Sequence, residues 1–331
     1  METLNFSTNA LKQVGSEIAT LTNLKTLDVS SNQIARIPPE IGNLRQLVTL
    51  DVSGNKLTEI PHEITYLVNL QNLILKDNPG VTSLPNLSSL RNLQVLNLRN
   101  LQISVVPQEI VQLPSLRELI LRENPQLKQV PGWLSQCQNL KKLDLYGNKL
   151  KTLPPELGRL TGLQHLDLRS NDLTADTLPR EIGDLVGLRK LLLAQNHLST
   201  LPPELKNLRL LEELDVSNNS LSVLPDEIGE LQTLTKLTLS GNKLTTLPQS
   251  IGKLVNLTAL DIKSNEIAEL PDEIAHLVAC KKIDASHNML TELPWDMGSM
   301  KDLKNLDVTH NPLVIPPRPI VQKGTEAILE W

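Results

Sequence analysis

The chain has 331 residues, of which 40% are hydrophobic and 21% are charged, and its formal net charge is −5 at pH 7. This charge is too small and of the wrong sign for a general nucleic-acid-binding protein. No run of apolar residues approaches the roughly 18 that a membrane-spanning helix requires. The two cysteines are too few for a disulfide framework or a cysteine-based zinc site.

One phrase, L-x-x-L-x-L-x-x-N, recurs along nearly the whole chain. Its closing position, here called the landmark, falls at residues 9, 32, 55, 78, 101, 124, 148, 171, 196, 219, 242, 265, 288 and 311. Thirteen of these 14 landmarks are Asn, and the exception is Leu101. A phrase of this kind, spaced by 23 to 25 residues, is the signature of leucine-rich repeats.

Each repeat predicts the same three elements in the same order. The alternating L-x-L of the phrase predicts a short strand with its apolar side chains on one side. The landmark Asn follows in a turn, where its side chain can bond main-chain groups. A segment such as residues 37–44, Ile-Pro-Pro-Glu-Ile-Gly-Asn-Leu, predicts a short helix. Stacked repeats then bury one continuous aliphatic core.

These elements predict an α/β leucine-rich repeat solenoid, a curved horseshoe with a concave parallel sheet of about 14 short strands and short helices or turns on its convex side. We expect a single domain over residues 1–331, with repeats to residue 311 and a closing segment over 312–331. Trp331 in that segment can cover the last core layer. No polar cap precedes the first strand phrase, although solenoids generally require such caps. The chain also ends within the expected closing helix, which hints at a segment of a longer protein and leaves a complete chain as the equal alternative.

The L-P-x-E-I-G-x-L segments, such as residues 153–160 and 224–231, resemble those of the intracellular Ras-group leucine-rich repeat proteins. The closing residues 311–313 and 323–329 add to this resemblance. It implies a non-enzymatic scaffold in cytoplasmic signalling that binds a small GTPase or a phosphatase through its concave face. Similar repeats also form arms of larger signalling enzymes, so that arrangement is an alternative.

The candidate binding site lies in the middle repeats, where two outward-facing columns change character. The column two positions before the landmark, usually a small residue, becomes a basic stripe with one aromatic. The third strand position, usually Asp, becomes aliphatic in three repeats, and we expect these side chains to be exposed. The predicted site consists of Ile74, Lys76, Arg99, Ile120, Arg122, Tyr146, His165, Arg169 and Leu192.

Exposed Arg, Tyr and aliphatic side chains on a rigid surface are the usual ingredients of a protein interface, so we expect this site to bind an acidic partner surface. The alternative is that the cations only solubilise the sheet and neutralise nearby carboxylates, namely Asp77, Glu123, Asp144 and Asp167. The segments that follow landmarks 78, 124 and 171 are longer than the others, and insertions in solenoids often lie near the binding face.

Catalysis is not expected, because the chain has no phosphate-binding Gly-rich loop, no H-E-x-x-H and no G-x-S-x-G. No cofactor is expected either. The column of Asp residues is interpreted as part of the scaffold, and His287 and His310 can approach one another but make a poor zinc site. An extracellular recognition domain usually has cysteine-stapled caps, so it is a less favoured alternative to a cytoplasmic location.

Overall fold

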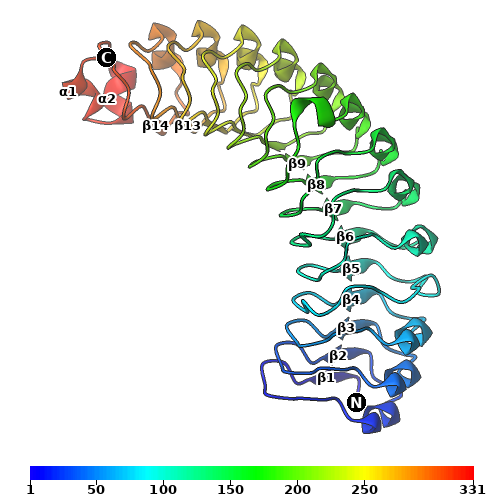
Figure 1. Cartoon of the computed structure of the whole chain (residues 1–331). Coiled ribbons are helices and arrows are strands. Elements are labelled where there is room, and N and C mark those ends of the chain that lie inside the picture. Colours follow the sequence, from blue (N-terminus) through cyan, green and yellow to red (C-terminus); the bar gives the residue numbers. More distant parts are fainter. The chain divides into compact units, whose positions relative to one another are not determined.

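The computed structural model describes residues 1–331 and divides into two compact units, Met1–Leu150 and Lys151–Trp331. The first unit holds seven parallel strands that pair in chain order (Figure 1): β1 (Thr3–Asn5), β2 (Thr26–Asp28), β3 (Thr49–Asp51), β4 (Asn72–Ile74), β5 (Val95–Asn97), β6 (Glu118–Ile120) and β7 (Lys142–Asp144).

The second unit holds seven more strands, again parallel and in chain order: β8 (His165–Asp167), β9 (Lys190–Leu192), β10 (Glu213–Asp215), β11 (Lys236–Thr238), β12 (Ala259–Asp261), β13 (Lys282–Asp284) and β14 (Asn305–Asp307). The prediction of a leucine-rich repeat solenoid with about 14 short parallel strands is therefore confirmed.

Every strand is three residues long, and its middle residue points into the core. Between β2 and β3, for example, buried Leu27 lies opposite buried Leu50, while Asp28 lies opposite Asp51 on the outer side. The first and third residues of each strand, and the residue two positions after the third, face outward. We call the surface formed by these three columns the open face of the sheet.

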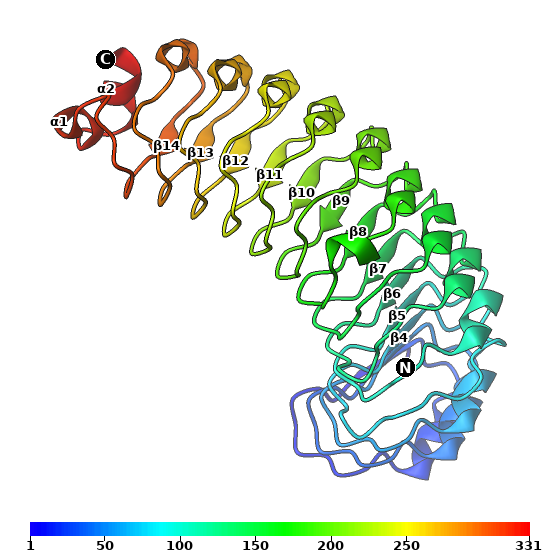
Figure 2. The same ribbon diagram turned by 45° about the horizontal axis from the view of Figure 1, so that its top comes forward.

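Short 3-10 helices stack on the side of each unit away from the strands (Figure 2). In the first unit they are η1 (Ser16–Thr20), η2 (Pro39–Asn43), η3 (His62–Tyr66), η4 (Gln108–Gln112) and η5 (Gly132–Gln136). In the second they are η6 (Pro155–Arg159), η7 (Ala175–Thr177), η8 (Arg180–Asp184), η9 (Pro203–Asn207), η10 (Asp226–Glu230), η11 (Gln249–Lys253), η12 (Asp272–His276) and η13 (Trp295–Ser299).

A Pro precedes most of these helices because its fixed φ suits a helix start. The glycine inside η10 is required by close packing against the next turn. A Cβ on Gly229 would lie 2.3 Å from the main-chain oxygen of Ser250 in η11. All of these helices are of the 3-10 form, which is used in short pieces.

The longer segments predicted after landmarks 78, 124 and 171 differ from one another in structure. Residues 75–94, between β4 and β5, contain no helix. The segment after Asn171 is long enough to form an extra turn, η7, whose start is held by a capping box between Thr174 and Thr177.

The landmark asparagines form the internal ladder that the repeat phrase predicts. Asn55 Nδ2 donates to the main-chain oxygens of Val29, Val52 and Ser53 at 3.0–3.1 Å, and its Oδ1 accepts the Ile34 N–H at 2.9 Å. At Leu101 the ladder is interrupted, and the following Asn124 keeps its three donated bonds while its buried Oδ1 has no partner.

The residue just before each landmark has a positive φ between 51° and 67° in all 14 repeats. Only three of these residues are glycine: Gly54, Gly147 and Gly241. This left-handed conformation costs a non-glycine residue roughly 1–2 kcal/mol, so the strand-to-turn corner is a recurrent point of strain.

The chain closes with helices α1 (Arg318–Val321) and α2 (Thr325–Glu330). Ile328 of α2 is buried, and Thr325 Oγ1 accepts the Leu306 N–H at 2.8 Å. The expectation that Trp331 covers the last core layer is wrong, because Trp331 is 45% exposed and stacks on Trp295 with ring centroids 5.1 Å apart. None of the helices has the length and hydropathy needed to cross a bilayer.

Candidate functional site

Six of the predicted site residues lie in the first unit, half-buried on its open face: Ile74, Lys76, Arg99, Ile120, Arg122 and Tyr146. Ile74 lies between Asp51 and Asn97 of the neighbouring strands, and Ile120 lies between Asn97 and Asp144. The two aliphatic side chains therefore interrupt a polar column, as the sequence predicts.

The arginines of this patch are engaged with carboxylates. Arg99 Nε donates to Glu123 Oε2 at 2.7 Å, and this hydrogen bond is the first cause of the raised pKa of Arg99. Arg122 forms two longer ion pairs, Nη2 to Glu123 Oε1 at 3.7 Å and Nη1 to Asp144 Oδ2 at 3.8 Å. Within the fold, these two arginines therefore neutralise neighbouring carboxylates, as the alternative interpretation of the sequence holds.

Arg122 also contacts the aromatic member of the patch. Its Cζ lies 4.5 Å from the centroid of the Tyr146 ring, a cation–π distance, and its buried Nε has no hydrogen-bond partner. Lys76 differs from both arginines because it forms no ion pair. The first-unit patch therefore combines held cations, one unpaired cation, one Tyr and two aliphatic side chains.

The other three predicted residues belong to the second unit. His165 is the first residue of β8 and is half-buried on the open face. Arg169 binds Asp167 through two bonds, Nη2 to Oδ2 at 2.6 Å and Nε to Oδ1 at 3.0 Å.

Leu192 was expected to be exposed, and this is wrong, because the structure leaves only 3% of it accessible. It lies opposite Asp167 on one side and Asp215 on the other. With so little of its side chain accessible, Leu192 offers almost no surface to a partner.

The Asp column has a structural role that its sequence position alone does not reveal. Asp28 Oδ1 accepts the main-chain N–H of Ser30 at 2.9 Å, and Asp51 does the same for Ser53 at 2.9 Å. The carboxylate thereby fastens the turn that leads to the landmark. The interpretation of this column as scaffold is consistent with these bonds. The signal in the sequence is the recurrence of Asp at the third strand position, with Ser or Thr two residues later in most of these repeats.

His287 and His310 do approach one another. Their rings stack with centroids 4.0 Å apart and planes 6° apart. Burial raises the pKa of Asp307, but the Thr309 N–H and hydroxyl, Lys263 and His287 outweigh it and bring that pKa below its ordinary value. No group of three or more His, Cys, Asp or Glu side chains is placed to hold a metal ion.

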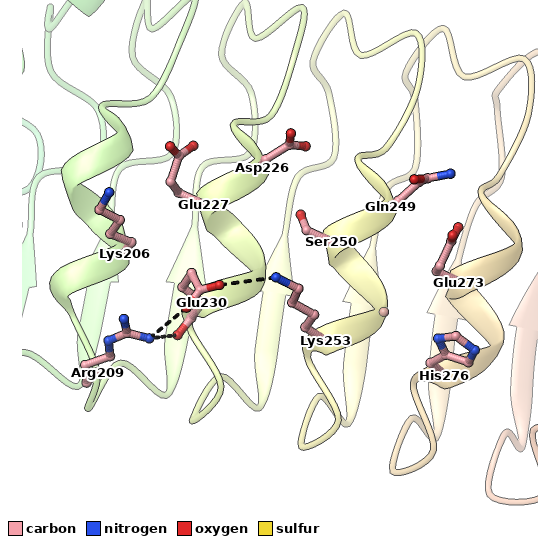
Figure 3. A pocket seen from close by; sticks show the side chains of 11 residues that line it. Lys206, Arg209, Asp226, Glu227, Glu230, Gln249, Ser250, Lys253, Glu273 and His276 are labelled. Carbon is pink, nitrogen blue, oxygen red and sulfur yellow. Dashed lines mark hydrogen bonds and ion pairs between the residues drawn. The ribbon is translucent and has the colours of Figure 1, made fainter.

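A groove of about 840 Å³ crosses the turns η9 to η12 of the second unit (Figure 3). Glu230 in the middle of the groove accepts bonds from Arg209 at 3.2 Å and from Lys253 at 3.3 Å. These two cations, Arg209 first, lower the pKa of Glu230. The bonds link successive repeats, so the charges serve the stacking of the turns.

Neither cysteine is suited to nucleophilic chemistry. Burial raises the pKa of Cys137 and of Cys280 to about 11, so both thiols stay protonated at neutral pH. The cysteines therefore supply no activated nucleophile. The ion pairs described above hold side chains in place and neutralise their charges.

Comparisons with known proteins agree with the repeat architecture. The family "Leucine-rich repeat region" matches residues 3–93, and the family "Leucine rich repeat" matches residues 128–173, 186–244, 209–267 and 232–290. No curated protein matches the chain.

Among solved structures, a leucine-rich repeat protein of Leptospira interrogans is 32% identical with a TM-score of 0.79, and the match covers 97% of this chain and 93% of that one. The leucine-rich repeat ectodomain of the Arabidopsis thaliana membrane receptor kinase GASSHO1/SCHENGEN3, solved with CASPARIAN STRIP INTEGRITY FACTOR 2, is 30% identical with a TM-score of 0.71. That match covers 94% of this chain but only 42% of the ectodomain.

An internalin, InlF of Listeria monocytogenes, shares the fold at 23% identity, with a TM-score of 0.78 and coverage of 92% of this chain and 86% of that one. The repeat phrase, the asparagine ladder and the extensive match to the Leptospira protein lead to one conclusion. The chain belongs to the leucine-rich repeat protein family.

Proposed function

We propose that this chain is a non-enzymatic, protein-binding scaffold that holds its partner on the open face of the sheet in the middle repeats. The observation that carries the proposal is the pair Ile74 and Ile120, which stand half-buried in a column that Asp occupies in most repeats. Partly accessible aliphatic groups beside Arg and Tyr are typical of interface cores.

Rigidity supports this proposal. Arg122 is fixed between Asp144, Glu123 and the ring of Tyr146, so little side-chain freedom is lost when a partner docks. Preorganised surfaces of this kind bind with a smaller ordering cost. Because Arg99 and Arg122 already face carboxylates, the charge pattern of the patch is mixed, and apolar contact provides most of the expected affinity.

The finer assignment rests on resemblance. The L-P-x-E-I-G-x-L segments favour the Ras-group type, a cytoplasmic location and a small GTPase or a phosphatase as partner. The alternatives are a leucine-rich repeat arm of a larger signalling enzyme and an extracellular recognition domain, the latter favoured by the likeness to a plant receptor ectodomain. Localisation of a fluorescent fusion in the source cells separates the cytoplasmic from the extracellular assignment.

The test of the proposed function is affinity capture from source-cell lysate with mass spectrometry. The variant is Ile74→Asp with Ile120→Asp, which restores the residue that most repeats carry, and the matched control is Thr238→Asp in β11. We expect the double variant to lose a partner that the wild type and the control both retain. An identical set of captured proteins from all three would overturn the proposal.

A further inference from the structure

On the open face of each repeat, the residue two positions after the strand has a main-chain N–H that can donate a hydrogen bond. In ten repeats a side chain of the same repeat accepts it. In these ten, an Asp or Asn oxygen at the third strand position accepts the main-chain N–H two residues later, at 2.8–3.2 Å. Eight of the ten acceptors are carboxylates and two are amides, Asn5 and Asn97. The site thus accommodates a carboxylate.

Four repeats lack this acceptor, because their third strand residue is Ile74, Ile120, Leu192 or Thr238. The main-chain N–H groups left without an acceptor belong to Lys76, Arg122, Ala194 and Ser240. A strong donor that the fold leaves unpaired gains a full hydrogen bond from any acceptor that a partner brings.

One filled repeat shows how a cation at this position adds to the site. Asp167 Oδ1 accepts both the main-chain N–H of Arg169 at 3.1 Å and its Nε at 3.0 Å, while Oδ2 accepts Nη2 at 2.6 Å. A single carboxylate is therefore held by the main chain and the side chain of the same residue. Charge-assisted bonds of this kind are the stronger ones.

Lys76 has the same two donors without the carboxylate. Its N–H has no acceptor because Ile74 stands where Asp167 stands in the filled repeat, and its Nζ forms no ion pair. Arg122 has an equally open N–H, but its guanidinium is occupied by Glu123, Asp144 and the Tyr146 ring.

The two other open positions, at Ala194 and Ser240, carry no charge. We propose that the Lys76 N–H and Nζ form a receptor for a carboxylate side chain, Asp or Glu, of the bound protein. Ile74 lies beside this receptor and provides apolar contact for the methylene groups of that side chain. The inference rests on the proposed function, since it names the chemistry by which the open face holds its partner.

The test needs no partner and uses acetate as the probe. Two-dimensional amide NMR of the full chain follows the Lys76 N–H as sodium acetate replaces sodium chloride at constant ionic strength. We expect a saturable downfield shift at Lys76 and none at Ser53, whose N–H is already bonded to Asp51. Equal shifts at both amides, or no shift at Lys76, would overturn the inference.

Two variants sharpen the result. In Ile74→Asp, the new carboxylate fills the site, so the Lys76 amide should already be shifted downfield and should no longer respond to acetate. In Lys76→Met, the N–H remains while the charge is lost, and we expect acetate binding to weaken about three- to tenfold. If Lys76→Met binds acetate as the wild type does, Nζ has no part in the receptor.

This measurement fails independently of the proposed function. A silent Lys76 amide together with a partner lost from the Ile74/Ile120 double variant would leave the binding face in place and remove only its carboxylate chemistry. A responsive Lys76 amide together with unchanged capture would leave a carboxylate receptor on a face that the captured proteins do not use, and would remove its assigned role in partner binding.

Discussion

Two groups of repeats share the same buried core but differ at the third strand position. One group is built on β2, β3 and β10, and the other on β4 and β6. In the first group, which we call the regular repeats, Asp28, Asp51 and Asp215 fasten the following turn. In the second group, the middle repeats, Ile74 and Ile120 occupy that position and leave the turn unfastened. Within each strand, only the middle residue packs in the core, so the outward-facing positions can vary and can contact a partner.

The landmark ladder shows the same contrast. Asn55 in a regular repeat uses both its amide nitrogen and its oxygen, whereas Asn124 after the interruption at Leu101 has a buried oxygen without a partner. The repeat built on β6 thus departs from the regular ones in two independent columns, whereas the repeat built on β4 keeps all its landmark bonds at Asn78. A buried acceptor without a partner costs about 1–3 kcal/mol, so these departures are expected to lower local stability.

The largest effect is expected from removing a complete landmark. Asn55→Ala leaves the buried Ile34 N–H without an acceptor and takes one of two donors from each of the Val29, Val52 and Ser53 carbonyls. It should lower the free energy of unfolding by about 2–3 kcal/mol in urea denaturation followed by circular dichroism. Asn124→Ala removes one bond fewer and should cost about 1 kcal/mol less. Equal losses from the two variants would mean that the Asn124 oxygen is satisfied in solution.

The next effect comes from the close stacking of the 3-10 turns. Gly229→Ala places a Cβ 2.3 Å from the Ser250 main-chain oxygen, so one of the two turns must move. We expect a loss of about 1–3 kcal/mol in unfolding free energy. The control Gly15→Ala meets only the flexible end of Glu17 and should stay within about 0.5 kcal/mol of wild type.

A gain is expected at the left-handed corner of a regular repeat. Ser264 has a φ of 53° and the adjacent repeat carries Gly241 at the same position, so Ser264→Gly should raise the unfolding free energy by about 0.5–1 kcal/mol. In a middle repeat, Glu123→Gly also relieves the corner but removes the ion pair with Arg99. Thermal unfolding should show a higher Tm for the Ser264 variant only.

The smallest effect concerns charge at the first strand position. Burial raises the pKa of Glu213, but hydrogen bonds from Lys190 and Lys236 outweigh it, so the pKa lies below the ordinary 4.5. The stabilisation is therefore present above about pH 4.5 and is lost as the pH falls through the lowered pKa.

Glu213→Gln tests this directly. The variant should be less stable than wild type by no more than about 1 kcal/mol at pH 7, because the carboxylate is partly exposed. The difference should disappear in acid, where the wild-type carboxyl is protonated in both states. A difference that persisted in acid would assign the effect to packing rather than to charge.

Much of this fold follows from the sequence because the repeat phrase specifies it fourteen times. The strand count, the parallel order and the asparagine ladder all depend on spacing along the chain. Helical segments form where the repeat predicts them except between β4 and β5, where there is none. Spacing along the chain did not give their 3-10 form or the close contact of Gly229 with Ser250.

The candidate site was less predictable, because the contacts of its side chains depend on residues in neighbouring strands. The columns that hold Ile74, Arg99 and Arg122 were visible as departures from the repeat. The burial of Leu192 was not visible in the sequence, because this residue occupies the same column as Ile74 and Ile120, which are only half-buried. The open N–H of Lys76 follows from the sequence only once the Asp-to-turn bond is known from the regular repeats.

The central claim is that the middle repeats exchange a stabilising Asp for a binding surface. The most direct measurement is urea unfolding of the variant that carries Ile74→Asp and Ile120→Asp, beside the wild type. Because each new Asp can fasten its turn, we expect the unfolding free energy to stay unchanged or to rise by up to about 1 kcal/mol. A fall of more than about 2 kcal/mol would show that the two isoleucines hold the fold together, and would contradict the claim.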